Sequence, residues 1–355
     1  MVTEKSPYDE DELEEDGEEE QELFEHFHID VDKGQSMLRI DKFVSAKIQN
    51  ATRSKVQAAA DAGNILVNDK AVKSSYRVKP NDSISIVMPY PPRKIEIIPE
   101  NIPINIVYED DDLIVVNKEP GMVVHPGHGN YSGTMVNALM YHLRDVPLFS
   151  TGDVRPGLVH RIDKNTSGII VIAKTEHSLN FLARQFFNRT ADRTYVAIVW
   201  GDMEEDEGTI EANIGRGPRD RMKMFVFPEG EDGRHAVTHW RVIERLGYVT
   251  LVECKLETGR THQIRVHFEH IRHPIFNDNR YGGDTIVKGR VFTTYKQFIQ
   301  HCFTLCPRHA LHAKSLGFIH PTTGKQMLFD SELPHDMAQV VEQWRSKYAS
   351  DEPNE

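Results

Sequence analysis

The sequence predicts an α+β protein in which a small domain precedes a larger one built on a mixed, mostly antiparallel sheet. Short β-branched runs recur from residue 104 onward, which is typical of strands. Amphipathic stretches with helical spacing, such as HSLNFLARQFFN, lie between them. The Pro-rich PYPPRK at residues 89–94 has the composition of a semi-rigid linker and separates the two parts.

The N-terminal segment, residues 1–28, is predicted to be an acidic disordered tail. Its first 25 residues hold 13 acids and one Lys, which accounts for the whole net charge of −12. Such a composition cannot bury enough apolar surface to offset the entropy of ordering. A sharper alternative is that the tail competes with RNA for basic surface, because the rest of the chain is neutral overall with local basic clusters.

Residues 29–90 are predicted to fold as a compact small domain. Leu38, Phe43, Val44 and Ile48 follow helical spacing, and Thr52 or Ser54 can cap a second helix that ends before a turn at Gly63. ILVNDKAV then has the pattern of a hairpin that turns at Asn68-Asp69. RVKPNDSISIVM has the pattern of a turn followed by a closing strand.

The strings RIDKF, TRSKVQ and ILVNDK of this region resemble the S4 RNA-binding domain. Asp69 stands where that family usually has Gly, and Asp tolerates the left-handed turn geometry. The resemblance implies an RNA-binding surface; a solvated basic helix face is the alternative. The side chains expected to contact RNA are Arg39, Lys42, Arg53 and Lys55.

Residues 91–345 are predicted to form the larger domain, and residues 346–355 a short tail. Strands are expected at INIVYED, LIVVNK, GIIVIAK, TYVAIVWG and YVTLVECKLE. No apolar run approaches the roughly 18 to 20 residues that a membrane span needs. The N-terminus lacks a secretory signal and the three cysteines are too few for a disulfide framework, so a cytoplasmic protein with buried or free thiols is expected.

The stretch GLVHRIDKNTSGIIVIAKT, residues 157–175, places Asp163 among basic residues just before a wholly apolar run. Residues two apart in an extended segment share a face, so Arg161 and Asp163 are expected to be neighbours. Ile169 to Ala173 reads as a fully buried strand, which would hold the carboxylate rigidly. A surface ion pair would give the same string, so further segments have to decide between the two interpretations.

Three further segments favour a functional site over a surface ion pair. LETGRTHQIRVH, from residue 256, offers Arg260, His262 and Arg265 at a strand-to-helix transition. RTYVAIVWG, from residue 193, places Tyr195 at the entry of a strand, and NKEPGMVVHPGHGN, from residue 117, forms a polar loop between strand-like runs.

Together with HPIFNDNRYGG and HALHAKSLGFIHP, these segments resemble the RluA-type pseudouridine synthases, within them the subgroup of ribosomal large-subunit pseudouridine synthases D. The resemblance covers roughly residues 36–345. It implies an S4 domain followed by a catalytic domain with a central sheet flanked by helices. It also implies that uridine in large-subunit ribosomal RNA is isomerised to pseudouridine without a cofactor.

The resemblance assigns roles to single residues. The family's catalytic Asp maps onto Asp163 and its base-stacking Tyr onto Tyr195. The basic residue that pairs with the Asp maps onto Arg265, with Arg260 as the second candidate. Arg161 matches the arginine that fills the place of an extruded base, and Ile264 matches the hydrophobic residue that lines the pocket. Whether Asp163 attacks C1′ or acts as a base on the sugar is left open.

Other features of the sequence allow alternative interpretations. Glycoside hydrolysis usually needs two carboxylates, whereas the motifs surround one acid with bases. The histidines near residue 262 and the pair Cys302 and Cys306 lack metal-site spacing, so no metal is expected. The loop GRGPRDRMKM, residues 215–224, is expected to grip RNA phosphates unless it is an ordinary solvated loop. Its side chains are Arg216, Arg219 and Arg221.

The expected partner is ribosomal RNA, with no membrane and no small-molecule cofactor, and the protein is expected to be a monomer. The alternatives are an RNA-binding ribosome-assembly factor without catalysis, and a pseudouridine synthase that acts on another RNA such as tRNA.

Overall fold

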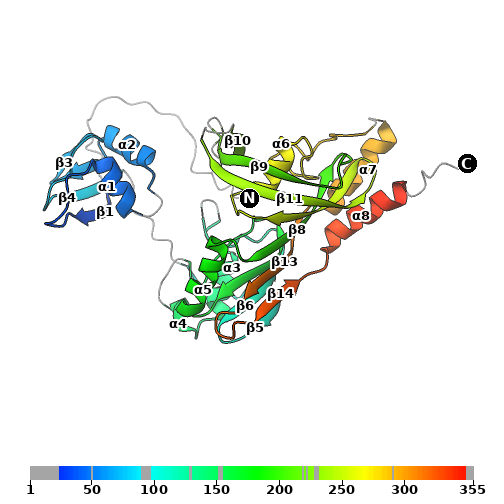
Figure 1. Cartoon of the computed structure of the whole chain (residues 1–355), viewed down its shortest axis with the longest axis horizontal. Coiled ribbons are helices and arrows are strands. Elements are labelled where there is room, and N and C mark those ends of the chain that lie inside the picture. Colours follow the sequence, from blue (N-terminus) through cyan, green and yellow to red (C-terminus); the bar gives the residue numbers. More distant parts are fainter. Residues whose placement is uncertain are drawn as a thin grey trace, which may run out of the picture. The chain divides into compact units, whose positions relative to one another are not determined.

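The computed structural model describes residues 24–48, 51–88, 97–127, 130–150, 155–217, 220, 223–227, 232–289 and 292–348. These residues form two compact units, one within residues 1–94 and one within residues 95–355 (Figure 1). The linker predicted at residues 89–94 lies outside the described residues. Within the described part of the chain, every helix is too short or too polar to cross a lipid bilayer.

The first unit is a four-stranded antiparallel sheet, in the order β1-β4-β2-β3, with two helices. Its apolar core includes Phe43 and Val44 of the first helix, two of the four residues whose spacing predicted it, while Leu38 and Ile48 lie just outside that helix. The elements are β1 (Phe24–Asp30), α1 (Ile40–Lys47), α2 (Arg53–Asp61), β2 (Ile65–Val67), β3 (Lys70–Ala71) and β4 (Ser83–Met88).

Local residues account for the turns of this unit. The Thr52 side chain accepts a hydrogen bond from the Lys55 amide and caps α2, as one of the two predicted candidates. Asn68 and Asp69 have φ values of 50° and 63°, so both take the left-handed conformation that a tight hairpin turn requires. The predicted hairpin is confirmed.

Strand β1 corrects the predicted extent of the acidic tail. It begins at Phe24, although residues up to 28 were expected to be disordered. Its backbone pairs with β4, with Phe24 opposite Met88 and Ile29 opposite Ile84. Pairing across the sheet outweighs the poor strand propensity of a charged segment, and this tertiary contribution is absent from local composition. Residues 1–23 of the predicted tail lie outside the described residues.

The second unit contains a ten-stranded sheet in the order β10-β9-β11-β12-β8-β13-β7-β6-β5, with β14 paired to β13. All neighbours are antiparallel except β7 and β13, so the predicted mixed, mostly antiparallel sheet is confirmed. Its strands are β5 (Ile106–Glu109), β6 (Leu113–Lys118), β7 (Ser167–Ala173), β8 (Asp192–Trp200), β9 (Glu207–Arg216), β10 (Met224–Phe227), β11 (Arg234–Arg245), β12 (Val249–Leu256), β13 (Leu311–Ile319) and β14 (Gln326–Asp330).

Helices flank this sheet, as predicted. Helix α5 contacts β7 and β13, and α6 contacts β9, β10 and β11. Helix α8 continues to Tyr348, past the predicted end of the domain at residue 345. The helices are α3 (Met135–His142), α4 (Pro147–Ser150), α5 (Glu176–Phe187), α6 (Gln263–His270), α7 (Thr293–Leu305) and α8 (His335–Tyr348).

Strand β7 is the rigid element beside the predicted catalytic residue. All of its residues are buried, and it lies between β6 and β13. At Gly168 the backbone has a φ of +119°, and a Cβ atom there would lie 2.1 Å from the Ala313 carbonyl oxygen. Only glycine therefore allows β7 and β13 to approach each other at this point.

Candidate active site

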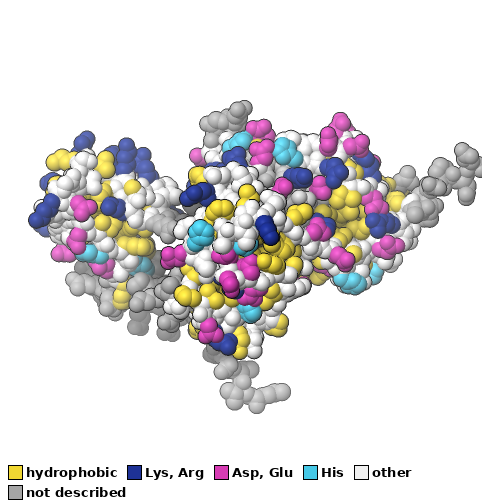
Figure 2. All heavy atoms as spheres, turned by 60° about the horizontal axis from the view of Figure 1, so that its bottom comes forward, with side chains coloured by type: hydrophobic (Ala, Val, Ile, Leu, Met, Phe, Trp, Pro, Cys, Tyr) yellow, Lys and Arg dark blue, Asp and Glu magenta, His cyan; other side chains and the backbone are white. Residues whose placement is uncertain are grey.

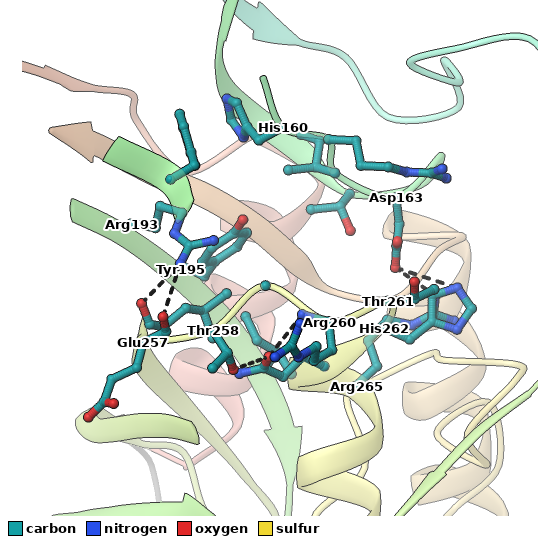
Figure 3. A pocket seen from close by; sticks show the side chains of 18 of the residues that line it. His160, Asp163, Arg193, Tyr195, Glu257, Thr258, Arg260, Thr261, His262 and Arg265 are labelled. Atoms are coloured by element: carbon teal, nitrogen blue, oxygen red, sulfur yellow. Dashed lines mark hydrogen bonds and ion pairs between the residues drawn. The ribbon is translucent and has the colours of Figure 1, made fainter. Parts of the chain in front are cut away.

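A pocket of about 520 Å³ opens at the end of the β12–α6 connection. The segment before β7, the start of β8 and the end of α5 complete its walls (Figure 3). It brings together six residues that the sequence placed in the site: Arg161, Asp163, Tyr195, Arg260, Ile264 and Arg265. These residues are separated by up to about one hundred positions along the chain, so the sheet assembles the site.

Backbone hydrogen bonds fix the turn that carries Asp163. The Thr166 amide donates to the Asp163 carbonyl, and the Lys164 carbonyl accepts from the Gly121 amide at 2.9 Å. The ammonium group of Lys118 is buried and donates to three carbonyl oxygens, those of Glu119, Met122 and Lys164, at 2.7, 2.9 and 3.0 Å. The loop after β6 and the Asp163 turn are thus joined at one buried charge.

The side chain of Asp163 pairs with Arg265. Arg265 Nη1 lies 2.9 Å from Asp163 Oδ2, and the rest of the guanidinium donates to Asp278 at 2.7 and 2.8 Å. Arg265 extends from the first turn of α6, and Asp278 follows the helix in the loop that β8 anchors through Ile275. The alternative partner, Arg260, donates instead to the His235 carbonyl. The geometry therefore selects Arg265.

Opposing effects set the charge state of this pair. Burial alone would raise the pKa of Asp163, but the neighbouring His262, Arg265 and His309 outweigh it, and the pKa of the carboxyl lies below its ordinary value. Burial would lower the pKa of Arg265, yet its hydrogen bonds and attraction to Asp278 and Asp163 raise it. The site thus holds an ionised carboxylate against a permanently charged guanidinium.

His262 supplies a second contact to Asp163. Its Nε2 lies 3.9 Å from Asp163 Oδ2; burial lowers the pKa of the ring, and the nearby charge of Asp163 opposes that shift. The Tyr281 hydroxyl accepts from the Met224 amide and lies 2.9 Å from His262 Nδ1. The Tyr281 hydroxyl thus holds the His262 ring at Nδ1, with Nε2 on the side of Asp163.

Tyr195 and Ile264 form the apolar part of the pocket. Tyr195 is buried near the start of β8, opposite Cys254 of β12. Burial raises the pKa of its hydroxyl, which therefore stays protonated. Ile264 is buried in the first turn of α6. An aromatic ring beside a fixed carboxylate suits a planar ligand such as a nucleobase.

Arg161 lies in the same pocket as Asp163. It lines the pocket and is exposed, but among the ion pairs of the described residues none joins it to Asp163. The segment before β7 is not a regular strand, so the two-residue alternation does not by itself bring the two side chains into contact.

The other predicted RNA contacts lie outside the pocket. Lys42 and Lys55 are exposed on the first unit. Arg39 and Arg53 lie 3.1 and 3.0 Å from the wholly buried carboxylate of Asp41. Figure 2 shows several Lys and Arg side chains gathered on this unit. Asp41 thus fixes two guanidinium groups at the starts of α1 and α2.

The predicted loop at residues 215–224 is in part a hairpin. Gly215 and Arg216 pair with Phe225 and Met224, so its ends belong to β9 and β10. Arg219 and Arg221 lie outside the described residues.

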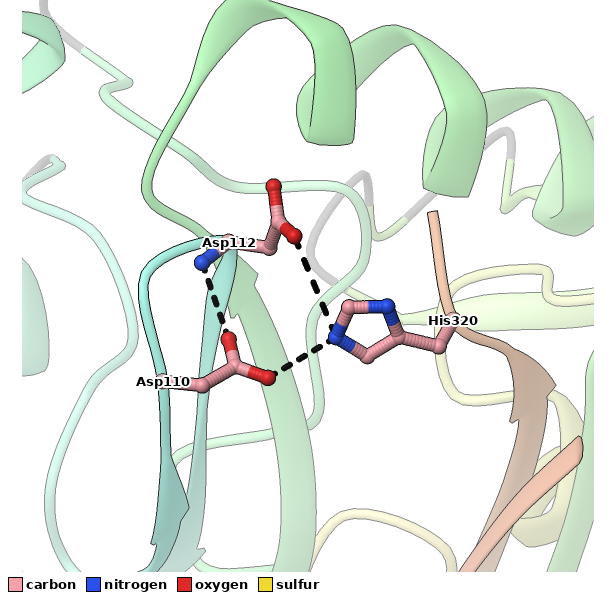
Figure 4. A group of neighbouring side chains, drawn as sticks. All are labelled: Asp110, Asp112 and His320. Carbon is pink, nitrogen blue, oxygen red and sulfur yellow. Dashed lines mark hydrogen bonds and ion pairs between the residues drawn. The ribbon is translucent and has the colours of Figure 1, made fainter. Parts of the chain in front are cut away.

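The cysteines and one cluster of acidic and histidine side chains lie outside the pocket. Cys254, Cys302 and Cys306 are buried free thiols, as expected. Asp110, Asp112 and His320 lie close enough to suggest a cation site (Figure 4). However, His320 Nδ1 accepts from two backbone amides, and Asp110 is bonded to Tyr108, His320 and the backbone. These hydrogen bonds make the cluster a structural link between the β5–β6 turn and the end of β13.

Sequence reasoning missed Asp278, Tyr281 and Lys118. Asp278 and Tyr281 lie in HPIFNDNRYGG and Lys118 in NKEPG, strings that carried the family resemblance without a role for these residues. Polar residues within a turn-like string give no signal of burial. The available hint was an acid and a Tyr in the segment that follows α6, with Asp278 13 positions after Arg265.

Comparison with known proteins gives a consistent result. Residues 112–270 match the family model described as RNA pseudouridylate synthase, and residues 38–84 match the S4 domain. The chain is 48% identical to an RNA pseudouridine synthase of Chlorobaculum parvum, over 90% of this chain and 97% of the relative. It is 41% identical to the ribosomal large subunit pseudouridine synthase D of Zymomonas mobilis, over 84% and 91%.

Among solved structures, the human protein RNA pseudouridylate synthase domain containing 4 shares the fold. The TM-score is 0.53 at 22% identity, and the match covers 68% of this chain and 93% of the human one.

Proposed function

The chain belongs to the RNA pseudouridine synthase family, and we propose that it isomerises uridine in large-subunit ribosomal RNA with Asp163 as the catalytic carboxylate. The observation that carries the proposal is the pairing of Asp163 with Arg265 in a pocket that Tyr195 also lines. The relative of Zymomonas mobilis, which carries the name of a large-subunit synthase, supports the choice of RNA.

The reaction sets clear demands on this site. The bond between N1 of uracil and C1′ of ribose breaks, the base turns, and a bond between C5 and C1′ forms. C5 loses a proton and N1 gains one, so atoms and electrons balance without an oxidant or reductant. Extruding the uridine costs a few kcal/mol of stacking, and an aromatic platform offsets part of that cost.

Each pocket residue has a part in this proposal. Asp163 acts in its ionised form, either as nucleophile at C1′ or as base on the sugar. Arg265 keeps it ionised and oriented. Tyr195 stacks on the uracil, Ile264 closes the apolar side, and Arg161 enters the place that the extruded base leaves. Arg39, Lys42, Arg53, Lys55, Arg216, Arg219 and Arg221 are proposed to hold the surrounding RNA.

Tritium release from RNA labelled with 5-³H-uridine tests the proposal, because C5 loses its hydrogen in the reaction. Unmodified large-subunit RNA from the protein's own source should release tritium with the wild type and none with Asp163→Asn. RNA affinity should change by less than about tenfold. Turnover by Asp163→Asn near the wild-type rate would refute the role of Asp163.

The same assay separates the alternatives. An RNA-binding assembly factor would bind this RNA without release, and an enzyme for tRNA would release tritium only from tRNA. We further propose that the protein acts in the cytoplasm as a monomer. Three buried cysteines without a disulfide agree with a reducing compartment.

A further inference from the structure

The pocket continues past the proposed uridine site to an exposed aromatic ring. Phe187, the last residue of α5, lines the pocket and is 86% exposed, more than any other large hydrophobic side chain of the described residues. The preceding Phe186 differs, because its ring stacks on His160 with the centroids 4.4 Å apart. Phe187 thus offers a free aromatic face at the rim.

Arg189, close to Phe187 in the chain, has a backbone conformation that is unusual for a residue other than glycine. Helix α5 ends with the Thr190 amide donating to the Gln185 carbonyl at 2.9 Å, a closure that places Arg189 in the left-handed conformation with a φ of 61°. Glycine is favoured at that position, and a bulky residue costs conformational energy. Arg189 also lines the pocket.

Positive charge is concentrated around this ring. Burial lowers the pKa of Arg260, and the charges of Arg234 and Arg189 lower it further. Burial also lowers the pKa of Arg193, and Arg189 adds to that shift. Arg189 thus lies close enough to repel both Arg260 and Arg193, and Arg234 repels Arg260. In the described part of the chain, one carboxylate is within ion-pair distance of them, Glu257 at 3.9 Å from Arg189.

Arg193 also has unused hydrogen-bonding capacity. Its Nε is buried without a partner among the described residues, and its Nη2 makes only long contacts, of 3.4 and 3.5 Å, to two carbonyls. Figure 3 shows Arg193 and Glu257 on the side of the pocket opposite to Asp163 and His262. The side of the pocket away from the reacting carboxylate thus carries an excess of donors and positive charge.

We propose that Phe187, Arg189 and Arg260 form a second nucleotide subsite, which takes an unpaired nucleotide next to the target uridine. Its base stacks on Phe187, and its phosphate pairs with Arg189 and Arg260. The inference rests on the proposed function, since the uridine in the Asp163 pocket fixes which nucleotide reaches the rim. An aromatic face beside arginines is the combination that binds single-stranded RNA.

The test uses the full chain and a synthetic, unmodified stem-loop that contains a uridine whose modification has been mapped. Phe187→Ala should lower kcat/KM and RNA affinity about tenfold, within the range measured for loss of one base–aromatic stack. Phe187→Tyr should restore both. Phe292→Ala is the matched control, because Phe292 is 64% exposed but does not line the pocket.

A double-mutant cycle between the Phe187 variant and altered RNA identifies the nucleotide that stacks on Phe187. The stem-loop carries an abasic nucleotide on one or the other side of the target uridine. For the wild type, RNA affinity should fall about tenfold at one of these two positions. The same change should cost Phe187→Ala no more than twofold, because the interaction is already absent. Equal losses for both proteins at both positions would overturn the subsite.

Arg189→Gly separates binding from structure. Glycine suits the backbone of this position, so a structural role predicts unchanged or higher stability and unchanged affinity. The subsite predicts weaker RNA binding and a salt dependence reduced by about one phosphate contact.

The outcomes for the two proposals differ. If Phe187→Ala binds and turns over the stem-loop like wild type while Asp163→Asn is inactive, the subsite is wrong and the proposed function stands. If the wild type releases no tritium but Phe187→Ala still weakens binding tenfold, the proposed function fails, while the contact between Phe187 and RNA stands.

Discussion

Arg265 donates hydrogen bonds to both carboxylate oxygens of Asp278, at 2.7 and 2.8 Å, and a third nitrogen of its guanidinium is left for Asp163. Asp278 is wholly buried, and Arg265 also lies over the ring of Tyr281 at 5.1 Å. The residue that orients the proposed catalytic carboxylate is thus itself fixed on three sides. A side chain with so few alternative positions can hold its partner to a narrow geometry.

The Asp278→Asn variant should show what the ion pair between Asp278 and Arg265 contributes. It leaves a buried guanidinium with half of its charge balance, so the free energy of unfolding should fall by about 3 kcal/mol. The kcat should fall at least tenfold because Arg265 is free to turn. Thermal unfolding and tritium release measure the two effects. Glu253→Gln, which breaks a surface pair with Arg241, should cost less than about 1 kcal/mol; an equal cost would contradict the special role of Asp278.

The pH dependence of kcat/KM should report the charge of Asp163. Because its pKa lies below the ordinary value, activity should persist to low pH and decline only as the carboxylate takes up its proton. Arg265→Ala removes the charge that opposes burial, so the acid limb should move to higher pH by roughly 1 to 3 units. Arg265→Lys keeps a charge and should move it less.

Arg260→Ala is the comparison for this profile. Its guanidinium bonds the His235 carbonyl and does not contact Asp163, so the acid limb should stay in place even if RNA binding weakens. If the acid limb moved in Arg260→Ala and not in Arg265→Ala, the partner of Asp163 in solution would not be Arg265.

The buried ammonium of Lys118 should be important for both stability and activity. Burial lowers the pKa of Lys118 to about 7, while the three carbonyls around it favour the charged form. Lys118→Met leaves those carbonyls without a donor, so the free energy of unfolding should fall by about 3 kcal/mol. The Asp163 turn loses a fixed point, and kcat should fall with it. Lys255→Met, at an exposed site in β12, should change stability by less than about 0.5 kcal/mol.

The S4 unit offers a prediction about binding. The hydrogen bond from Arg39, together with Arg53 and Gln57, outweighs burial and holds the pKa of Asp41 well below its usual range. Asp41→Asn weakens the attachment of both arginines, so RNA affinity should fall while kcat at saturating RNA is kept. Filter binding and tritium release test this expectation. Asp61→Asn removes the same charge from an exposed position and should leave affinity unchanged within twofold.

The sequence was informative wherever local pattern decides the structure. Spacing predicted α5 and the strands of the larger unit. Asn68-Asp69 predicted the hairpin of the smaller unit, because left-handed φ values restrict residue choice. Strand order was not accessible: β13 lies between β7 and β8 although it follows them by more than one hundred residues. Such pairing depends on packing that no local window contains.

The same limit applies to the site. Asp163 and Arg265 were found because their motifs are specific to a family. Asp278 was not, because NDNR has the composition of an exposed turn and its burial results from the surrounding fold. Strand β1 was assigned to the tail because the acidic run continues into it.

The parallel contact between β7 and β13 has a consequence for synthesis of the protein. His312 lies opposite Ser167, and the strand that supports Asp163 gains its second neighbour only when residues 311–319 are available. A nascent chain that already carries Asp163, Tyr195 and Arg265 still lacks this neighbour while it is on the ribosome. Activity should therefore appear only after residues 311–319 have been made.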